Sequence, residues 1–188
     1  MRVHLSGFFA AVFVLFFAGC DKEDFGYKNE VNIQKRTQNS GKFALELNDG
    51  SVLKVSKHDN KGLFFEGYEG KAVLLNFFAT WCPQCKAEIP HLVNLKNSHK
   101  DELEIIGILM EDTRSAEEIG RFAEAFEINF KIALSSENQK LAKALGGIRS
   151  IPFMILYNPK GEYVTHYIGT VPEEMIEFDI KRALEKQR

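Results

Sequence analysis

The sequence predicts an α/β sandwich with a mixed central sheet and an N-terminal β-hairpin. Short apolar runs typical of buried strands alternate with segments of helical periodicity, and a second hairpin followed by a helix closes the chain. With 188 residues, 45% of them hydrophobic, the chain can form one domain with a substantial core. The formal net charge of −2 includes no basic surplus, so we expect no nucleic-acid partner.

Residues 1–19 have the pattern of a lipoprotein signal peptide. Phe8 to Ala18 is an unbroken apolar run, too short to span a bilayer but suited to the core of a signal peptide. It ends in Ala18 and Gly19 before Cys20, which resembles the lipobox of bacterial lipoproteins, where the cysteine thiol carries lipid. We therefore expect lipidation of Cys20, with a plain secretory signal and a chance cysteine as the alternative.

These features predict a location in the bacterial cell envelope, with the protein anchored by lipid to a membrane. The folded domain would face the periplasm or another extracytoplasmic space. Residues 20–41 are polar and show little periodicity, so we expect the lipidated cysteine to be followed by a flexible tether, or alternatively by an extra strand. The domain itself is expected over residues 42–188. If Cys20 is acylated, Cys82 and Cys85 are the two cysteines that remain, and no odd thiol is left over.

The first expected element of the domain is the hairpin. Phe43–Leu47 and Val52–Val55 alternate apolar and polar side chains, and residues 48–50 (Asn-Asp-Gly) supply the turn. A loop over Gly62–Gly70 follows. Ala72–Phe77 is then a nearly continuous apolar run, which suits a strand buried on both faces of a sheet.

The rest of the domain alternates helices with strands. The helix after the cysteines has apolar residues at helical spacing: Ala87, Ile89, Leu92, Val93 and Leu95. Strands are expected over Leu103–Met110, Phe130–Leu134, Pro152–Tyr157 and Glu162–Tyr167. Helices are expected over Ser115–Ile128 with a Ser115/Glu118 capping box, over Glu137–Leu145, and from Pro172 to about Lys186. The last helix is expected to share one apolar face among Met175, Ile176, Ile180 and Leu184.

The stretch FFATWCPQCKAEIP places Cys82 and Cys85 where a buried strand ends and a helix begins. A structural zinc site needs four ligands, and the chain has neither a second C-x-x-C nor an H-x3–5-H pair, so no metal or other cofactor is expected. An inert disulfide across so short a loop would stabilise little. The strand-to-helix position favours a reactive dithiol, because backbone N–H groups and the helix dipole stabilise a thiolate at Cys82. Cys82 would then form a mixed disulfide that Cys85 resolves.

Residues 73–86 (VLLNFFATWCPQCK), together with Pro90 and residues 150–153 (SIPF), resemble the thioredoxin superfamily. The closer resemblance is to membrane-anchored thiol–disulfide oxidoreductases of the TlpA/ResA type, and it covers about residues 42–187. Those proteins insert a helix and a strand after the active-site helix, and Glu118–Leu134 fits that insert. The resemblance implies a thioredoxin-like three-layer sandwich.

The resemblance also implies roles for individual residues. Cys82 would be the nucleophile and Cys85 the resolving thiol, with Trp81 packed beside the pair on the substrate-binding surface. The Ile151–Pro152 bond would be cis and would place the backbone of Ile151 beside the disulfide, where it can pair with a client peptide. The alternatives are a Trp81 that only fills the core and a Pro152 that only starts a strand.

Two features depart from thioredoxin itself. Thioredoxin has a buried Asp where this chain has Asn76, whereas the TlpA/ResA type carries an acid shortly after the second cysteine, which Glu88 matches. Glu88 lies three residues beyond Cys85 and can share its helix face, so we expect it to tune proton transfer; a solvated helix charge is the alternative. The inner dipeptide is Pro83-Gln84, with proline first, which leaves the direction of electron flow open.

We therefore expect an exported, lipid-anchored thiol–disulfide oxidoreductase that acts mainly as a disulfide reductase. Exported cysteine-containing proteins such as apocytochrome c are plausible clients, as in cytochrome c maturation, and a membrane electron-donor thiol protein would supply the electrons. The first alternative is an oxidant or isomerase using the same pair. The second is a copper(I)-binding module, since soft thiolates suit that ion, although the related copper-delivery proteins use C-x-x-x-C. A peroxiredoxin-type peroxidase matches poorly, because Thr80 here precedes a C-x-x-C.

Overall fold

The computed structural model describes residues 41–58, 62–111 and 114–185. The expected signal peptide, the lipidation site Cys20 and nearly all of the expected tether lie outside these residues. The elements in chain order are β1 Lys42–Glu46, β2 Val52–Lys57, β3 Leu63–Phe65, β4 Ala72–Phe78, α1 Pro83–Ser98, β5 Leu103–Leu109, α2 Ala116–Ala125, β6 Lys131–Ala133, α3 Glu137–Ala144, β7 Phe153–Tyr157, β8 Tyr163–Ile168 and α4 Glu173–Glu185.

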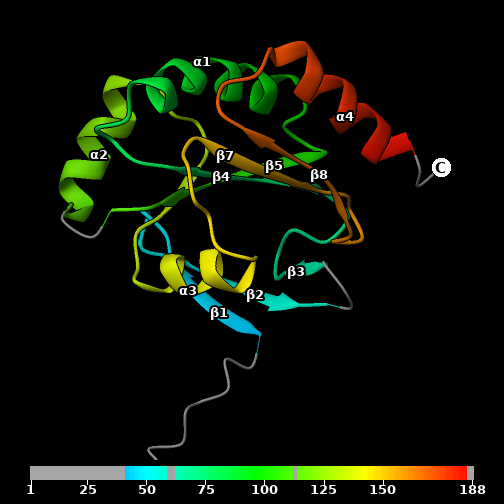
Figure 1. The fold of residues 1–188 in the computed structure, drawn as a ribbon, viewed down its shortest axis with the longest axis horizontal. Helices are drawn as coiled ribbons and strands as arrows, with labels where there is room; N and C mark the ends of the chain where they lie inside the picture. Colours follow the sequence, from blue (N-terminus) through cyan, green and yellow to red (C-terminus); the bar gives the residue numbers. More distant parts are fainter. Residues whose placement is uncertain (1–40, 59–61, 112–113, 186–188) are drawn as a thin grey trace, which may run out of the picture. The chain divides into compact units, whose positions relative to one another are not determined.

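A five-stranded mixed sheet forms the middle layer, in the order β6-β5-β4-β7-β8. Strand β4 pairs in parallel with β5, and β5 with β6, whereas β7 and β8 run antiparallel to their neighbours. Helices α1 and α4 cover one face, and α3 with the small β1–β3 sheet covers the other (Figure 1). The predicted α/β sandwich with a mixed sheet is confirmed.

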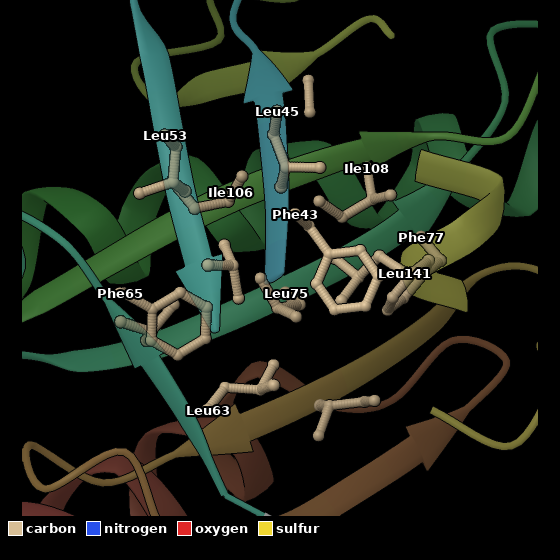
Figure 2. Close-up of a cluster of buried hydrophobic side chains, with 14 of the residues drawn as sticks. Phe43, Leu45, Leu53, Leu63, Phe65, Leu75, Phe77, Ile106, Ile108 and Leu141 are labelled. Carbon is tan, nitrogen blue, oxygen red and sulfur yellow. The ribbon is translucent and has the colours of Figure 1, made fainter. Parts of the chain in front are cut away.

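The two central strands are buried along their whole length, as their apolar runs predicted. Every residue of β4 and β5 is buried, because both faces of the sheet are covered. On the face of the small sheet, Leu45 and Leu53 point toward Ile106 and Ile108 of β5 (Figure 2). On the other face, side chains of α1 and α4 pack on the sheet, among them Leu92, Leu95, Ile176 and Ile180.

The prediction of a plain loop over residues 62–70 is wrong at its start. Leu63–Phe65 forms strand β3, which pairs with β2 and extends the predicted hairpin to a three-stranded antiparallel sheet. Leu63 and Phe65 are buried while Phe64 between them is exposed, so this short segment has the alternation of a half-buried strand. The N–H of Leu63 donates to the oxygen of Gly161, where a Cβ would lie 2.0 Å from the Leu63 oxygen; this close approach requires glycine.

The inserted helix α2 begins as predicted and ends earlier. Ser115 and Glu118 exchange the two hydrogen bonds of a capping box, which confirms that prediction. The helix stops at Ala125 rather than continuing to residue 128, and Glu127 has a φ of 51°. In α4, Ile176 and Ile180 are buried as predicted. Met175 was predicted to share this buried face, but it is 52% exposed, so that part of the prediction is wrong.

Candidate active site

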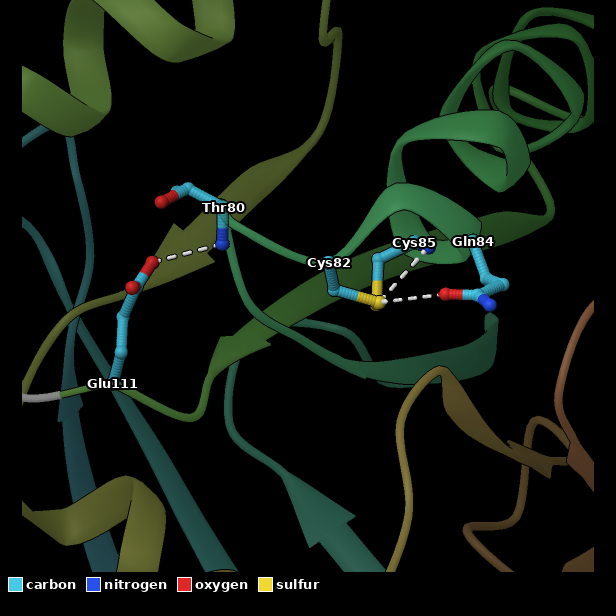
Figure 3. Close-up of a disulfide and its surroundings, with 5 residues drawn as sticks. All are labelled: Thr80, Cys82, Gln84, Cys85 and Glu111. Atoms are coloured by element: carbon cyan, nitrogen blue, oxygen red, sulfur yellow. Dashed lines mark hydrogen bonds between the residues drawn. A yellow bond between two sulfur atoms is a disulfide. The ribbon is translucent and has the colours of Figure 1, made fainter.

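The sulfur of Cys82 lies at the N-terminus of α1. Strand β4 ends at Phe78, and Cys82 is the N-cap residue, with φ −82° and ψ 113°. Its side chain accepts a hydrogen bond from the backbone N–H of Cys85 at 3.1 Å (Figure 3). Pro83 occupies the first helical position, where its missing N–H costs nothing. The first turn of α1 contains no acidic side chain, so no carboxylate of that turn counters the positive end of the helix dipole at this sulfur.

Cys82 and Cys85 form a disulfide, with their Cα atoms 5.2 Å apart. Both residues are almost fully buried, with exposed fractions of 3% and 1%. The neighbouring Trp81 is 64% exposed, so the alternative in which it fills the core is wrong. The side-chain oxygen of Gln84 lies 4.0 Å from the Cys82 sulfur, which places a polar group of the inner dipeptide beside the redox centre.

Glu88 is buried inside the fold rather than solvated on the helix surface. It is 1% exposed, and neither carboxylate oxygen makes a regular hydrogen bond to the described residues. Burial raises the pKa of Glu88, while the nearby charge of His91 and the backbone N–H of Val171 act in the opposite direction. The alternative of a solvated helix charge is therefore wrong. Asn76 on β4 is also buried, and its side-chain oxygen has no partner among the described residues.

The Ile151–Pro152 peptide bond is cis, as the resemblance to thioredoxins implied. Ile151 packs against the cluster of buried side chains that contains both cysteines, although it is 66 residues beyond Cys85 in the chain. Pro152 is buried, and its carbonyl oxygen accepts a hydrogen bond of 2.9 Å from Gly169. The structure therefore brings the predicted client-binding segment to the disulfide.

The end of β5 and the inserted helix α2 make contacts next to the active-site loop that the sequence did not predict. The Thr80 N–H donates to a carboxylate oxygen of Glu111 at 2.8 Å (Figure 3). On α2, the Phe122 ring stacks on Phe78 with centroids 6.1 Å apart. The Lys86 ammonium lies 6.0 Å from the ring centroid of Phe126. No local pattern marks these residues, since each contact joins segments more than 30 positions apart.

Comparison with known proteins agrees with the thioredoxin-like geometry of this site. The profile of the family described as Redoxin matches residues 39–183. The chain belongs to the Redoxin family. It is 30% identical over 135 residues to thiol-disulfide oxidoreductase ResA of Bacillus subtilis, covering 71% of this chain and 68% of that relative. It is 34% identical over 110 residues to the ResA of Halalkalibacterium halodurans, covering 58% of this chain and 60% of that one.

A solved structure shows the same fold. The thiol:disulfide interchange protein of Chlorobium tepidum, described as a thioredoxin family protein, superposes with a TM-score of 0.62 and 23% identity, covering 77% of this chain and 94% of that one. The chain is thus a TlpA/ResA-like member of the thioredoxin superfamily with the predicted thioredoxin-like sandwich. Its relatives and its Cys82–Cys85 pair identify it as a thiol–disulfide oxidoreductase.

None of the helices in the described part of the chain is both long enough and apolar enough to cross a membrane. Within the same residues, no group of three or more His, Cys, Asp or Glu side chains is arranged to hold a metal ion. Copper(I) could be bound by the two cysteines alone, since such a site needs only two ligands. Copper(I) binding therefore stays a prediction, which a metal titration would test.

Proposed function

We propose that this oxidoreductase is a lipid-anchored disulfide reductase on the extracytoplasmic side of a bacterial membrane. It would take electrons from a membrane electron-donor thiol protein and pass them to exported cysteine-containing clients such as apocytochrome c. The likeness to two ResA proteins supports the proposal, and the lipobox-like pattern before Cys20 supports the anchor.

One structural observation carries the proposed direction: the buried carboxyl group of Glu88 lies three residues beyond Cys85. A strong oxidant stabilises its reduced form as a thiolate. The negative charge of an ionised Glu88 and the Gln84 oxygen 4.0 Å from the Cys82 sulfur both disfavour a thiolate at Cys82. The reduced form is therefore less stabilised than in such an oxidant, which favours donation of electrons.

The reduction of a client disulfide would proceed in two exchange steps. In the first, the Cys82 thiolate attacks one client sulfur; a Cys82–client disulfide forms, and the other client sulfur leaves as a thiolate. In the second, Cys85 gives its proton to the Glu88 carboxylate and attacks the Cys82 sulfur. The Cys82–Cys85 disulfide forms, and the second client sulfur leaves as a thiolate that takes up a proton from solvent. The client gains two electrons, which the two cysteines lose.

The reduction potential of the Cys82–Cys85 pair tests the direction. A reductant is expected to equilibrate near the value of thioredoxin, about −270 mV, and to reduce insulin, whereas a value near about −120 mV would make the protein an oxidant. A Cys82→Ser variant serves as the inactive control. Tight copper(I) binding by the reduced protein, without insulin reduction, would favour the copper-binding module instead.

Lipid attachment is tested separately on the full chain expressed in a bacterial host. The wild-type chain is expected to partition into detergent and to incorporate labelled fatty acid, whereas a Cys20→Ser variant should do neither. A wild-type chain released into the soluble fraction without label would contradict the anchor but would leave the oxidoreductase chemistry intact.

A further inference from the structure

The backbone ladder between β4 and β5 ends just before the active-site loop. At its end, the N–H of Met110 donates to the oxygen of Phe78 at 2.9 Å. Two residues after Phe78, the N–H of Thr80 donates to a side chain instead, namely a carboxylate oxygen of Glu111 at 2.8 Å (Figure 3). A side chain from the end of β5 therefore continues the attachment of the chain to the sheet into the loop that carries the cysteines.

This hydrogen bond lies in a buried setting. The Glu111 side chain is 9% exposed, and Thr80 is 8% exposed. A hydrogen bond to a carboxylate is roughly twice as strong as one between neutral groups, and a buried N–H that loses its partner is not compensated by water. The Thr80 hydroxyl, by contrast, makes no hydrogen bond to the described residues. The contact between the two residues therefore runs through the main chain of the loop.

Glu111 is also in contact with the start of the inserted helix α2. The Nε atom of Arg114 lies 3.9 Å from the second carboxylate oxygen of Glu111, and its Nη1 atom lies 3.2 Å from a carboxylate oxygen of Glu118. Glu118 in turn forms the capping box of α2 with Ser115. One oxygen of Glu111 thus faces the active-site loop, and the other faces the cap of a helix. The ion pairs of Arg114 are more exposed, so they contribute less than the buried bond to Thr80.

Thr80 directly precedes the two residues that an incoming disulfide meets. Trp81 is 64% exposed, and Cys82 is the N-cap residue of α1, with its N–H donating to the oxygen of Ala79 at 3.2 Å. An exposed side chain does little to fix the backbone beneath it. The position of this segment therefore depends on the anchored residues on either side, which are Thr80 before it and the first turn of α1 after it.

We propose that Glu111 is a positioning residue for thiol–disulfide exchange. By holding the N–H of Thr80, it fixes the segment that presents Trp81 and the Cys82 sulfur to an incoming disulfide. It acts through the main chain of the loop and not on the sulfur atoms. Loss of the acceptor would leave this segment free to shift, and misplacing reacting atoms by about 1 Å can slow a reaction about 100-fold. The inference rests on the oxidoreductase activity of the chain and is independent of the direction of electron flow.

The position of the loop can be observed directly, because Trp81 is the single tryptophan of the chain. The first readout is the fluorescence anisotropy of Trp81 in the oxidised protein. Glu111→Ala removes the acceptor and should lower the anisotropy. Glu111→Gln keeps an oxygen that can accept the Thr80 N–H and loses only the charge, so it should restore the anisotropy. Thr80→Val keeps the N–H and removes the unpaired hydroxyl, so it should also keep the wild-type anisotropy.

The second readout is the rate constant for the reaction of the reduced protein with oxidised glutathione. The Cys82 thiolate attacks one glutathione sulfur and the other leaves as a thiolate, whichever direction of electron flow the protein favours with its clients. Glu111→Ala is expected to slow this reaction on the order of tenfold, and Glu111→Gln should recover most of the rate. Glu124→Ala, an exposed acid on α2, is the matched control and should change neither readout. Thermal melts confirm that each variant is folded.

Three results would overturn the proposal. The first is a Glu111→Ala protein with unchanged anisotropy and rate. The second is a Glu111→Gln protein that behaves like Glu111→Ala, because the charge of Glu111 and not its bond to Thr80 would then matter. The third is a loss of anisotropy in Thr80→Val equal to that in Glu111→Ala, which would assign the anchor to the hydroxyl. A failure of the reductase proposal would appear in the reduction potential instead, and an oxidant should show the same effects of Glu111.

Discussion

The backbone N–H of Cys85 donates a 3.1 Å hydrogen bond to the sulfur of Cys82. Cys82 and Cys85 are joined by a disulfide and are almost equally buried. This hydrogen bond is the contact that makes their two sulfur atoms different. The Cys82 sulfur is the one that accepts a backbone N–H at the N-terminus of the helix. The negative charge of a thiolate is therefore better stabilised at Cys82 than at Cys85.

Trapping variants test this asymmetry. Cys85→Ser keeps the attacking thiol and removes the resolving one, so it should accumulate a mixed disulfide with a client or with insulin. Cys82→Ser should accumulate at least tenfold less, as judged from the thiolate-stabilising effect of the helix N-terminus. Mass spectrometry of the adducts under non-reducing conditions measures both, and more adduct with Cys82→Ser would reverse the assignment.

The Gln84 side chain offers a direct means to shift the reduction potential. Its oxygen lies 4.0 Å from the Cys82 sulfur, so Gln84→Glu would place a negative charge beside the developing thiolate. Like charges disfavour ionisation; the thiol pKa of Cys82 should rise, and the potential should become more negative by roughly 30 mV, which corresponds to about 1.4 kcal/mol. Gln139→Glu on α3 provides the matched control. A shift to a less negative potential would show that the Gln84 side chain does not face the thiolate in the reduced protein.

Trp81 is expected to act in client binding and not in the thiol chemistry. It is 64% exposed next to the nucleophile, and exposed tryptophans of this kind often dominate interface energies. Trp81→Ala should reduce kcat/KM for a protein client about tenfold, or about 1.4 kcal/mol, while the reaction with a small aromatic disulfide stays within about twofold. Phe178→Ala, at 61% exposure on α4, is the control. Equal losses with both substrates would instead assign Trp81 to the redox centre.

The features that sequence could predict are those with a local cause. Ala72–Phe77 is predicted as a buried strand because nearly every residue in it is apolar, and β4 extends this strand by one residue. Ser115 and Glu118 specify a capping box within four residues. The cysteine pair and the Ile151–Pro152 segment were likewise recognisable from short motifs. In each case the residues that determine the feature lie together in the chain.

The features that were missed depend on contacts between distant segments. Strand β3 has only three residues, and its place is set by pairing with β2 and by the close approach of Gly161. The Glu111 carboxylate reaches Thr80 from the end of another strand, and Phe122 reaches Phe78 from the inserted helix. Neither an acid after a strand nor an aromatic residue in an amphipathic helix indicates by itself that it borders a redox centre.

Burial of Glu88 makes the stability of the oxidised protein depend on pH. An unfolded glutamate titrates near about pH 4.3, and burial raises the pKa of Glu88 in the folded state. Below both values the carboxyl group is neutral in either state. As the pH rises through them, the unfolded state loses its proton first, so the contribution of Glu88 to folding becomes unfavourable and stays so at higher pH.

Glu88→Gln should therefore leave Tm unchanged near pH 4 and raise it at pH 8. Each 1 kcal/mol by which the substitution increases the free energy of unfolding would raise Tm by roughly 2–4 °C. The exposed Glu124→Gln on α2 is the control and should show no such pH-dependent gain. Thermal melts of the disulfide form between pH 4 and 8 provide the measurement, and a Glu88→Gln variant less stable than wild type at pH 8 would contradict the effect of burial.

Gly107 couples the packing of the central sheet to the active-site cluster. It lies within β5, and a Cβ added there would be 3.0 Å from Cε1 of Phe78 and 3.4 Å from Cγ1 of Ile132. Both neighbours belong to the cluster of buried side chains that contains the two cysteines. Gly107→Ala would force the Phe78 ring to shift, and overpacking of this kind typically costs about 1–3 kcal/mol. The free energy of unfolding in urea should fall by that amount. The rate at which Cys85 displaces a thiolate from a mixed disulfide at Cys82 should change with it.

Gly120→Ala on α2 is the matched control, because its Cβ would meet nothing within 4 Å and alanine favours the helix by up to about 1 kcal/mol. A Gly107→Ala protein as stable as wild type would show that Phe78 can move without cost, and the cysteine cluster would then be less tightly packed than its burial indicates.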